Sequence, residues 1–269
     1  MSAVETYSGG DVRLMGGALG AEVWGVDIAQ LDDAGFADLH AKLLQHSVLA
    51  VHGQGHVSDE QLREFGLRWG QLDIHGYSPT VDGFEDVLRI HADAENPTVA
   101  EGWHSDVTWK TIPPKISMLL AQRVPSAGAF TLYASQYRAH EDLSDSMKAL
   151  LEPLDGVHDG RNFDIQEINR PVKHPVVLTH PETGRKALYV NEGFTRAIDG
   201  LPRDESNAIC KFLYAHCTKE RYQARLRYEP GTLSIWDNRC VQHMAVPDFN
   251  GETRELHRVA VLCDAPPTR

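Results

Sequence analysis

Apolar residues recur at helical spacing in two stretches of the first quarter of the chain. Residues 34–46 and residues 58–70 each place apolar side chains three or four positions apart, so that these side chains share one helical face. In the second stretch, Ser58 and Gln61 stand at the spacing of an N-terminal capping box. The sequence therefore predicts two amphipathic helices, whose apolar faces consist of Phe36, Leu39, Leu43, Leu62, Phe65 and Trp69.

Two more amphipathic helices are predicted farther along the chain, at residues 144–154 and 203–217. The second of them presents Ile209, Phe212 and Leu213 as apolar positions. The chain between and after these helices follows a different pattern, in which short apolar runs alternate with turns. These helices are therefore expected to pack on the outside of a structure made mainly of strands.

Short apolar and β-branched runs, separated by turns, dominate the rest of the sequence. Residues 47–53 and 116–122 are predicted as strands, and residues 174–191 as two strands around a Pro-x-x-Gly turn, which is a hairpin pattern. Residues 224–238 again hold two runs around a Pro-Gly turn, and residues 257–264 add a last strand. Such a succession favours an antiparallel sandwich or barrel over a parallel sheet, and a jelly roll with flanking helices fits best.

Composition limits the class of protein and of partner. The 269 residues contain 42% hydrophobic and 24% charged residues, no internal repeat and no low-complexity linker, so residues 1–269 are taken as one globular domain. The formal net charge of -12, without a run of Lys or Arg, argues against a nucleic acid or an anionic membrane as partner. A small anionic molecule stays compatible with this charge if a local Arg or Lys site receives it.

Cysteine usage and the absence of long apolar runs favour a cytoplasmic protein. The four cysteines contain no Cys-x-x-Cys pair, so they are expected to be reduced thiols, neither a disulfide framework nor a zinc ribbon. The first 20 residues have no continuous apolar segment of the kind that signal peptides carry. No run of apolar residues is long enough to span a bilayer. The sequence leaves the oligomeric state open, a homo-oligomer included.

Pairs of His and Asp two positions apart offer candidate metal ligands, but the motif occurs three times: His91/Asp93, His104/Asp106 and His140/Asp142. The first pair lies in a polar stretch and the third inside or just before a helix, so both are expected to be solvated surface pairs. The middle pair stands between Trp103 and Trp109 in "WHSDVTW", which would shield it from water. It is therefore the best candidate of the three.

A metal site of this kind needs a third protein ligand from a distant part of the chain. His243 follows an apolar strand and a tight turn, although a lone histidine in that position is more often structural. His104, Asp106 and His243 together would form a triad of two imidazoles and one carboxylate. This donor set suits a non-haem Fe(II) oxygenase, because it leaves three positions of an octahedron open.

Two arginines four positions apart, Arg254 and Arg258, lie at the start of a strand if the last predicted strand extends back over residues 253–256. Side chains alternate along a strand, so these two share a face, whereas Glu255 and His257 point to the other one. If the shared face is the inner one, both guanidinium groups need anionic ligands, because an unpaired buried cation is costly. An exposed edge strand with solvated arginines is the alternative that the stretch leaves open.

Several separated blocks resemble the taurine dioxygenase branch of the Fe(II)- and 2-oxoglutarate-dependent dioxygenases. They occur in the family's order along nearly the whole chain: "WHSDVTW", "VPSAGAFTLY", "HPETGRKALYVNEGFT", "WDNRCVQHMAVPDF" and "RELHRVAVL". Residues 31–46 show a looser similarity to herbicide-cleaving members. The resemblance implies a cupin-like double-stranded β-helix, in agreement with the jelly roll inferred from the strand pattern.

The resemblance also implies a role for each candidate ligand. His104, Asp106 and His243 would hold Fe(II), and 2-oxoglutarate would chelate that iron through its 1-carboxylate and keto oxygen. The distal carboxylate of 2-oxoglutarate would bind Arg254, whose planar guanidinium can form two parallel hydrogen bonds, with Thr131 adding a hydroxyl. One position on the iron would then remain for O2.

The reaction that the family implies is oxidative decarboxylation of 2-oxoglutarate to succinate and CO2, coupled to hydroxylation of a second substrate. In sulfonate- or sulfate-cleaving relatives, the hydroxylated product collapses to an aldehyde and an inorganic sulfur anion. Halogenating relatives lack the carboxylate ligand, so that halide can bind. Since this chain retains Asp106, the resemblance favours hydroxylation.

Substrate contacts are implied for four further residues. Arg258 would clamp an anionic head group, together with His75, the main-chain N–H of Val107 and the ring of Phe163. The residues that contact the amine end of taurine fall at Ser78 and Ala100, whose side chains are too small for those contacts. The anionic head group is therefore expected to be recognised, and the amine end is not. The expected substrate is another alkanesulfonate, an alkyl sulfate ester or a different small anion.

Two rival functions are compatible with parts of this pattern. A zinc-type metallohydrolase could use the same triad with a metal-bound water as nucleophile, but it would leave Arg254, Arg258 and Thr131 without a shared purpose. A non-catalytic jelly-roll binding protein could retain the fold and bind a ligand without consuming oxygen. The match of several independent blocks favours the dioxygenase over both.

Overall fold

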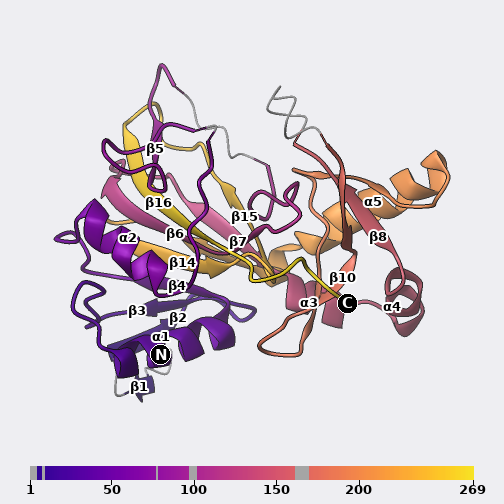
Figure 1. Ribbon diagram of the computed structural model, residues 1–269, viewed down its shortest axis with the longest axis horizontal. Helices are drawn as coiled ribbons and strands as arrows, with labels where there is room; N and C mark the ends of the chain where they lie inside the picture. Colours follow the sequence, from indigo (N-terminus) through magenta and orange to yellow (C-terminus); the bar gives the residue numbers. More distant parts are fainter. Residues whose placement is uncertain (1–4, 8–9, 77, 97–101, 161–169) are drawn as a thin grey trace.

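The computed structural model describes residues 5–7, 10–76, 78–96, 102–160 and 170–269. Strands predominate over helices, and the longest strands lie in the half of the molecule that also holds the N-terminal helices (Figure 1). Within the described residues, no helix combines the length and the apolarity needed to cross a bilayer.

The largest sheet has eight strands in the spatial order β1-β2-β3-β4-β14-β6-β16-β5. Neighbouring strands are antiparallel, apart from the parallel pair β3/β4. Their bounds are Glu5–Tyr7 (β1), Gly10–Leu14 (β2), Ala21–Val23 (β3), Val48–Val51 (β4), Leu88–Ala92 (β5), Pro114–Arg123 (β6), Leu233–Asp237 (β14) and Arg254–Leu262 (β16).

A second, three-stranded antiparallel sheet faces the large one and completes the jelly roll. Its order is β13-β7-β15, with bounds Gln223–Leu226 (β13), Thr131–Ser135 (β7) and Val241–Ala245 (β15). Side chains from both sheets form one buried cluster, in which Tyr133 of β7 and Val241 of β15 meet Trp236 of β14 and Leu256 of β16. The interior of the double-stranded β-helix lies between these two sheets.

Two helices cover the other face of the large sheet. They are α1 (Asp33–His46) and α2 (Asp59–Leu67), and their apolar stripes pack with the outward side chains of the sheet in a second cluster. The capping box predicted at the start of α2 is present: the Ser58 hydroxyl accepts from Gln61 N–H at 3.2 Å, and the Gln61 side chain accepts from Ser58 N–H at 2.9 Å. The predictions for these two helices are confirmed.

The remaining elements form a third cluster at the end of the molecule where the chain terminates (Figure 1). A small sheet of order β12-β8-β9 and the hairpin β10-β11 pack with three helices. The bounds are Gln136–Glu141 (α3), Asp145–Leu151 (α4), Asp155–His158 (β8), Val172–Pro175 (β9), Val177–Thr179 (β10), Lys186–Leu188 (β11), Thr195–Ile198 (β12), Arg203–Cys217 (α5) and the 3-10 helix Glu220–Tyr222 (η3).

Most of the predicted elements are confirmed, with two differences in detail. The hairpin predicted at residues 174–191 forms as β10-β11. The two runs of residues 224–238 are strands, but β13 and β14 belong to different sheets, so their Pro-Gly turn connects the two faces of the jelly roll. In α5, Phe212 is 41% exposed, because the buried face of the helix runs through Cys210, Leu213 and Cys217. The mainly β fold class with flanking helices is confirmed.

Candidate active site

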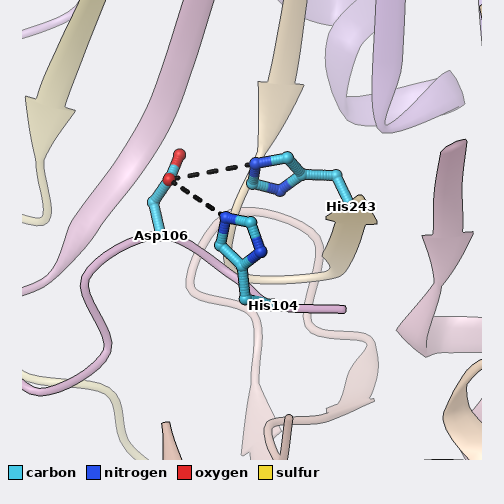
Figure 2. Close-up of side chains that lie close together, drawn as sticks. All are labelled: His104, Asp106 and His243. Carbon is cyan, nitrogen blue, oxygen red and sulfur yellow. Dashed lines mark ion pairs between the residues drawn. The ribbon is translucent and has the colours of Figure 1, made fainter. Parts of the chain in front are cut away.

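The three predicted metal ligands lie together beside β15, the edge strand of the second sheet (Figure 2). His104, on the segment before β6, forms an isolated antiparallel bridge with His243 of β15: the His243 N–H donates to the His104 carbonyl at 2.7 Å, and the reverse bond is 3.1 Å. The two rings are 4.2 Å apart at their centroids. Asp106 Oδ1 is 3.9 Å from the Nε2 atom of each imidazole.

On His104 and Asp106, the atoms that point away from the centre of the triad have partners of their own. The Nδ1 atom of His243 is buried without a hydrogen-bond partner among the described residues. His104 Nδ1 lies 2.8 Å from the Gly102 carbonyl, and donation to that carbonyl leaves Nε2 with a free lone pair. Asp106 Oδ2 accepts from the Ser117 hydroxyl at 2.6 Å and pairs with Arg258 Nη2 at 2.9 Å. One donor atom of each residue is therefore left to converge on a shared point, and these atoms lie within 4.8 Å of one another.

Burial and neighbouring charges give His243 and Asp106 the ionisation state that metal binding requires. Burial, helped by His104, lowers the pKa of His243 to about 3, so its imidazole is neutral. Burial raises the pKa of Asp106, but the Arg258 guanidinium and the two imidazoles outweigh it, and the net pKa lies well below the usual range. A neutral His243 and an ionised Asp106 can bind a cation without first releasing protons.

The other two His-x-Asp pairs take part in no such group of three among the described residues. His91 Nε2 is 2.9 Å from Asp93 and its Nδ1 is 3.1 Å from Glu255, so both ring nitrogens are engaged in a half-exposed ion-pair cluster. His140 lies within α3. Its ring is half-buried and Asp142 is exposed and paired with Arg221, so this pair is not the solvated surface pair that the sequence predicts.

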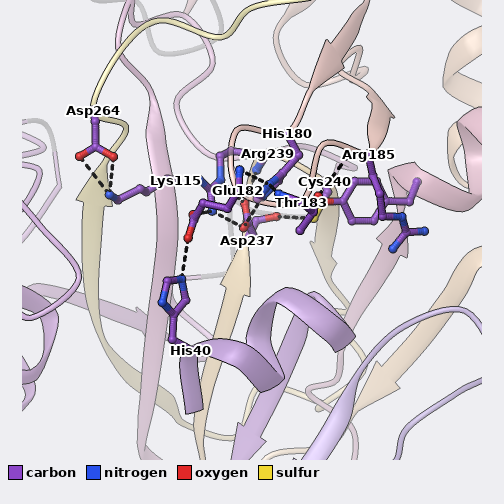
Figure 3. A network of polar contacts seen from close by, with 11 residues as sticks. His40, Lys115, His180, Glu182, Thr183, Arg185, Asp237, Arg239, Cys240 and Asp264 are labelled. Atoms are coloured by element: carbon purple, nitrogen blue, oxygen red, sulfur yellow. Dashed lines mark hydrogen bonds and ion pairs between the residues drawn. The ribbon is translucent and has the colours of Figure 1, made fainter. Parts of the chain in front are cut away.

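A second group with metal-ligating side chains, His180, Asp237 and Cys240, is already satisfied by protein contacts (Figure 3). Asp237 accepts two hydrogen bonds from Arg239, at 2.9 and 2.6 Å, and a third from His180 Nε2 at 2.9 Å. His180 Nδ1 accepts from the N–H groups of residues 182–183. Because the imidazole has no lone pair left and the carboxylate is bound on both oxygens, this group stabilises the fold and offers no vacancy for a cation.

Both predicted arginines lie on β16 with their side chains buried, Arg254 at 4% and Arg258 at 8% exposure. The strand pairs with β6 on one side and β5 on the other, so the edge-strand alternative is wrong. Arg254 Nη2 lies 3.4 Å from the Thr131 hydroxyl, and burial lowers the pKa of the guanidinium. No carboxylate within the described residues pairs with Arg254, so a bound anion would relieve a buried charge.

The residues expected to contact substrate are partly described. His75 is buried at 8% exposure with its ring against Trp109, and burial together with the nearby Arg258 lowers its pKa to about 4. Val107 adopts a left-handed φ of 51°, a strained conformation for a β-branched residue that the local fold must impose. Phe163 and Ala100 lie outside the described residues. Ser78 is half-buried.

Three residues near the triad were not singled out by sequence reasoning. Phe194 contacts the His104 ring edge-on at 5.8 Å and Trp109 at 4.5 Å, and it extends the apolar surface beside the triad. Ser117 and Asn238 hydrogen-bond to Asp106. The only sequence signal for Ser117 is a polar side chain inside the apolar run of β6, and for Asn238 its place in the turn that precedes β15.

Comparisons with known proteins agree with the fold. The family model described as taurine catabolism dioxygenase TauD, TfdA family matches residues 11–260. An alkylsulfatase of Acinetobacter baylyi is 31% identical, with 93% of this chain and 84% of the relative covered. An alpha-ketoglutarate-dependent sulfate ester dioxygenase of Pseudomonas putida is also 31% identical, with 95% and 90% covered.

The solved structures lead to the same family. A taurine dioxygenase from Burkholderia xenovorans superimposes with a TM-score of 0.85 at 31% identity, and the match covers 95% of this chain and 91% of that one. The resemblance seen in the sequence is thus confirmed, and the chain belongs to the taurine catabolism dioxygenase TauD, TfdA family.

Proposed function

We propose that this protein is an Fe(II)- and 2-oxoglutarate-dependent dioxygenase that hydroxylates a small sulfated or sulfonated organic anion. The observation that carries the proposal is one site in which two imidazoles and a carboxylate converge, on a fold whose last strand carries two buried arginines, one of them paired with that carboxylate. The relatives named above, which act on sulfate esters or taurine, support the same class of substrate.

The residues of the triad fit ferrous iron. Nitrogen and carboxylate donors on one face are the ligand set of non-haem Fe(II) oxygenases. His104, Asp106 and His243 would each contribute one atom, and the Gly102 carbonyl would keep His104 in the tautomer that has Nε2 free. When bound, the iron supplies the activation of O2 that is coupled to oxidative decarboxylation of 2-oxoglutarate.

Arg254 and Thr131 are positioned to receive the distal carboxylate of 2-oxoglutarate. The guanidinium is buried without a carboxylate partner among the described residues, and the threonine hydroxyl lies beside it at 3.4 Å. A bidentate pair with the carboxylate would neutralise that charge and set the direction in which the cosubstrate extends toward the triad. The hydroxyl would donate a further hydrogen bond to the same carboxylate.

Arg258, His75 and the Val107 N–H form the proposed site for the substrate anion, with Phe163 as a further contact. Arg258 Nη2 is held by Asp106 at 2.9 Å, and its remaining N–H groups can receive a sulfate or sulfonate. Holding the anion there places the adjacent C–H bond toward the triad. Hydroxylation of that carbon gives a product that releases sulfate or sulfite and leaves an aldehyde.

A succinate-release screen tests this proposal. Purified protein with Fe(II), ascorbate and 2-oxoglutarate is offered alkyl sulfates, alkanesulfonates, taurine and aryloxyacids under air. We expect succinate together with inorganic sulfate or sulfite for a member of the first two groups, and less for taurine. Release of the sulfur anion with zinc and without oxygen would favour the metallohydrolase, and ligand binding without oxygen uptake would favour a binding protein.

Replacing Arg254 with lysine is expected to weaken 2-oxoglutarate binding about tenfold or more, which corresponds to about 1.4 kcal/mol. Lysine retains the charge but loses the two parallel hydrogen bonds of the guanidinium. The apparent affinity is measured from the visible band that forms when Fe(II) and 2-oxoglutarate are combined anaerobically. Mn(II) affinity serves as the control and should not change, since Arg254 does not contact the triad.

Replacing Arg258 with alanine is expected to abolish turnover of the anionic substrate while 2-oxoglutarate affinity stays near the wild-type value. The variant removes the proposed anion clamp, but Asp106 keeps its bond from Ser117. Substrate-dependent oxygen uptake and cosubstrate affinity are measured on the same preparation. If Arg258→Ala loses 2-oxoglutarate affinity and Arg254→Lys loses only substrate turnover, the two arginines have each other's role.

A cytoplasmic location, the single-domain organisation of residues 1–269 and a homo-oligomeric state stay predictions from the sequence. Size-exclusion chromatography with light scattering addresses the last of them.

A further inference from the structure

Ser117 and Asn238 form a hydrogen-bonded chain that ends on the carboxylate of Asp106. Both side chains are buried, at 0% and 1% exposure. The Asn238 amide donates to the Ser117 hydroxyl at 2.9 Å, and that hydroxyl donates to Asp106 Oδ2 at 2.6 Å. Because the serine oxygen accepts from the amide, its single proton is directed to the carboxylate.

Asn238 also holds the main chain of Asp106. Its Oδ1 atom accepts from the Asp106 N–H at 3.1 Å and from Trp236 Nε1 at 2.9 Å. The amide therefore uses its oxygen for two donors and its nitrogen for the serine. Reversing the amide would put its NH2 group against two N–H donors, so only one orientation satisfies the site.

Rigid elements carry both residues. Ser117 lies within β6 and is paired with Trp236 of β14 in the register of the large sheet. The Asn238 N–H donates to the Lys115 carbonyl at 2.8 Å, which ties the turn after β14 back to β6. The position of Asp106 is thus fixed by contacts with the centre of the large sheet, in addition to the segment on which Asp106 itself lies.

We infer that Ser117 and Asn238 are positioning residues that orient Asp106 as a one-oxygen metal ligand. Their second effect concerns Arg258, the other partner of Asp106 Oδ2. If Arg258 alone held that oxygen, any shift of the guanidinium toward a substrate anion would also move the metal ligand. The bond from Ser117 keeps the carboxylate in place while Arg258 takes the anion. The inference rests on the proposed function only in so far as the triad binds a metal.

Metal affinity of the intact protein tests this role without turnover. Mn(II) is titrated by electron paramagnetic resonance into wild-type protein, Ser117→Ala, Asn238→Ala and Ser117→Thr, without 2-oxoglutarate or substrate. We expect the two alanine variants to bind Mn(II) more weakly, on the order of 10- to 100-fold, as outer hydrogen-bond partners of metal ligands do. Ser117→Thr retains the hydroxyl and should bind within about threefold of wild type.

The double variant adds a second criterion. The two residues share a hydrogen bond, but each also contacts Asp106 directly. Ser117→Ala combined with Asn238→Ala should therefore bind Mn(II) more weakly than either single variant, by less than the product of the two separate losses. The absorption of the Co(II)-loaded proteins should change in Ser117→Ala and return in Ser117→Thr, because it reports the geometry around the metal.

Ser206→Ala is the matched control. Ser206 is a buried serine of α5 whose hydroxyl accepts one hydrogen bond, from the Ile198 N–H at 2.8 Å, away from the triad. This variant should lower thermal stability without changing Mn(II) affinity. Should Asn238→Ala fail to fold, the serine variants alone decide the question.

Mn(II) affinity of Ser117→Ala within twofold of wild type would overturn the inference, and so would an equal loss of affinity in Ser206→Ala. The proposed reaction can fail separately. A wild-type protein that binds Mn(II) but never releases succinate contradicts the dioxygenase activity, and the comparison of Mn(II) affinities then still decides whether Ser117 and Asn238 orient the metal ligand.

Discussion

Replacing His243 with alanine is expected to lower 2-oxoglutarate turnover by more than about a hundredfold. Loss of an outer hydrogen-bond partner alone weakens metal affinity 10- to 100-fold, and His243 is proposed to be a direct ligand. The variant also leaves Asp106 and Arg258 paired next to a space where an imidazole was buried. Succinate formation and Mn(II) affinity, measured on one preparation, check the expectation.

His216→Ala is the control for His243→Ala. His216 is a buried histidine of α5 that donates to the Ala139 carbonyl at 2.7 Å, remote from the triad. Both variants remove a buried imidazole, but only His243→Ala should remove metal affinity. Wild-type turnover in a folded His243→Ala protein would contradict the assignment of the triad.

Replacing Arg239 with methionine is expected to reduce the free energy of unfolding by about 3–5 kcal/mol. The guanidinium is buried and binds both oxygens of the fully buried Asp237, as well as Glu182 at 2.8 Å (Figure 3). Methionine fills the space of the aliphatic stem but leaves the carboxylate with His180 as its remaining side-chain partner. Urea unfolding followed by circular dichroism measures the loss.

The pH dependence of stability gives a second readout for Arg239→Met. Burial raises the pKa of Asp237, but Arg239 and His180 outweigh it and hold the pKa of the folded protein below its unfolded value. The carboxylate therefore stabilises the wild type above the unfolded pKa of an aspartate, about 4, and this contribution is lost as the pH falls. In the variant this dependence should shrink or reverse.

Arg138→Met is the control for Arg239→Met. Arg138 pairs with Glu141 on the surface of α3, where both side chains are largely exposed. An exposed pair of this kind contributes at most about 1 kcal/mol. A loss for Arg239→Met no larger than that for Arg138→Met would show that the Asp237 network does not stabilise the fold in the way its burial indicates.

Periodicity predicts the helices and strands well because each pattern reports the local environment of consecutive residues. The apolar stripes of α1 and α2 and the capping box at Ser58 are local features, and they appear as expected. The turn at residues 229–232 is local as well, but the sheet that each flanking strand joins depends on partners far away in the chain. This is why β13 and β14 enter different sheets although their turn resembles that of a hairpin.

The same distinction applies to the site. His104, Asp106 and His243 could be selected because metal ligands have a restricted set of residue types, and Arg254 and Arg258 because their spacing on a strand is that of one face. The residues that hydrogen-bond to those ligands are not restricted to a few residue types. Ser117 and Asn238 are ordinary polar residues whose relation to Asp106 arises only when β6 and β14 lie side by side.

The bridge between His104 and His243 links two segments that are distant in the chain and belong to different parts of the fold. A cation held by both residues and by Asp106 would act as a cross-link, because it can bind all three only when the tertiary structure has closed. Loading with metal therefore shifts the folding equilibrium by mass action, by about 2.7 kcal/mol at a free metal concentration 100 times the dissociation constant. Depletion of metal in a cell would then shorten the lifetime of the folded chain as well as remove its activity.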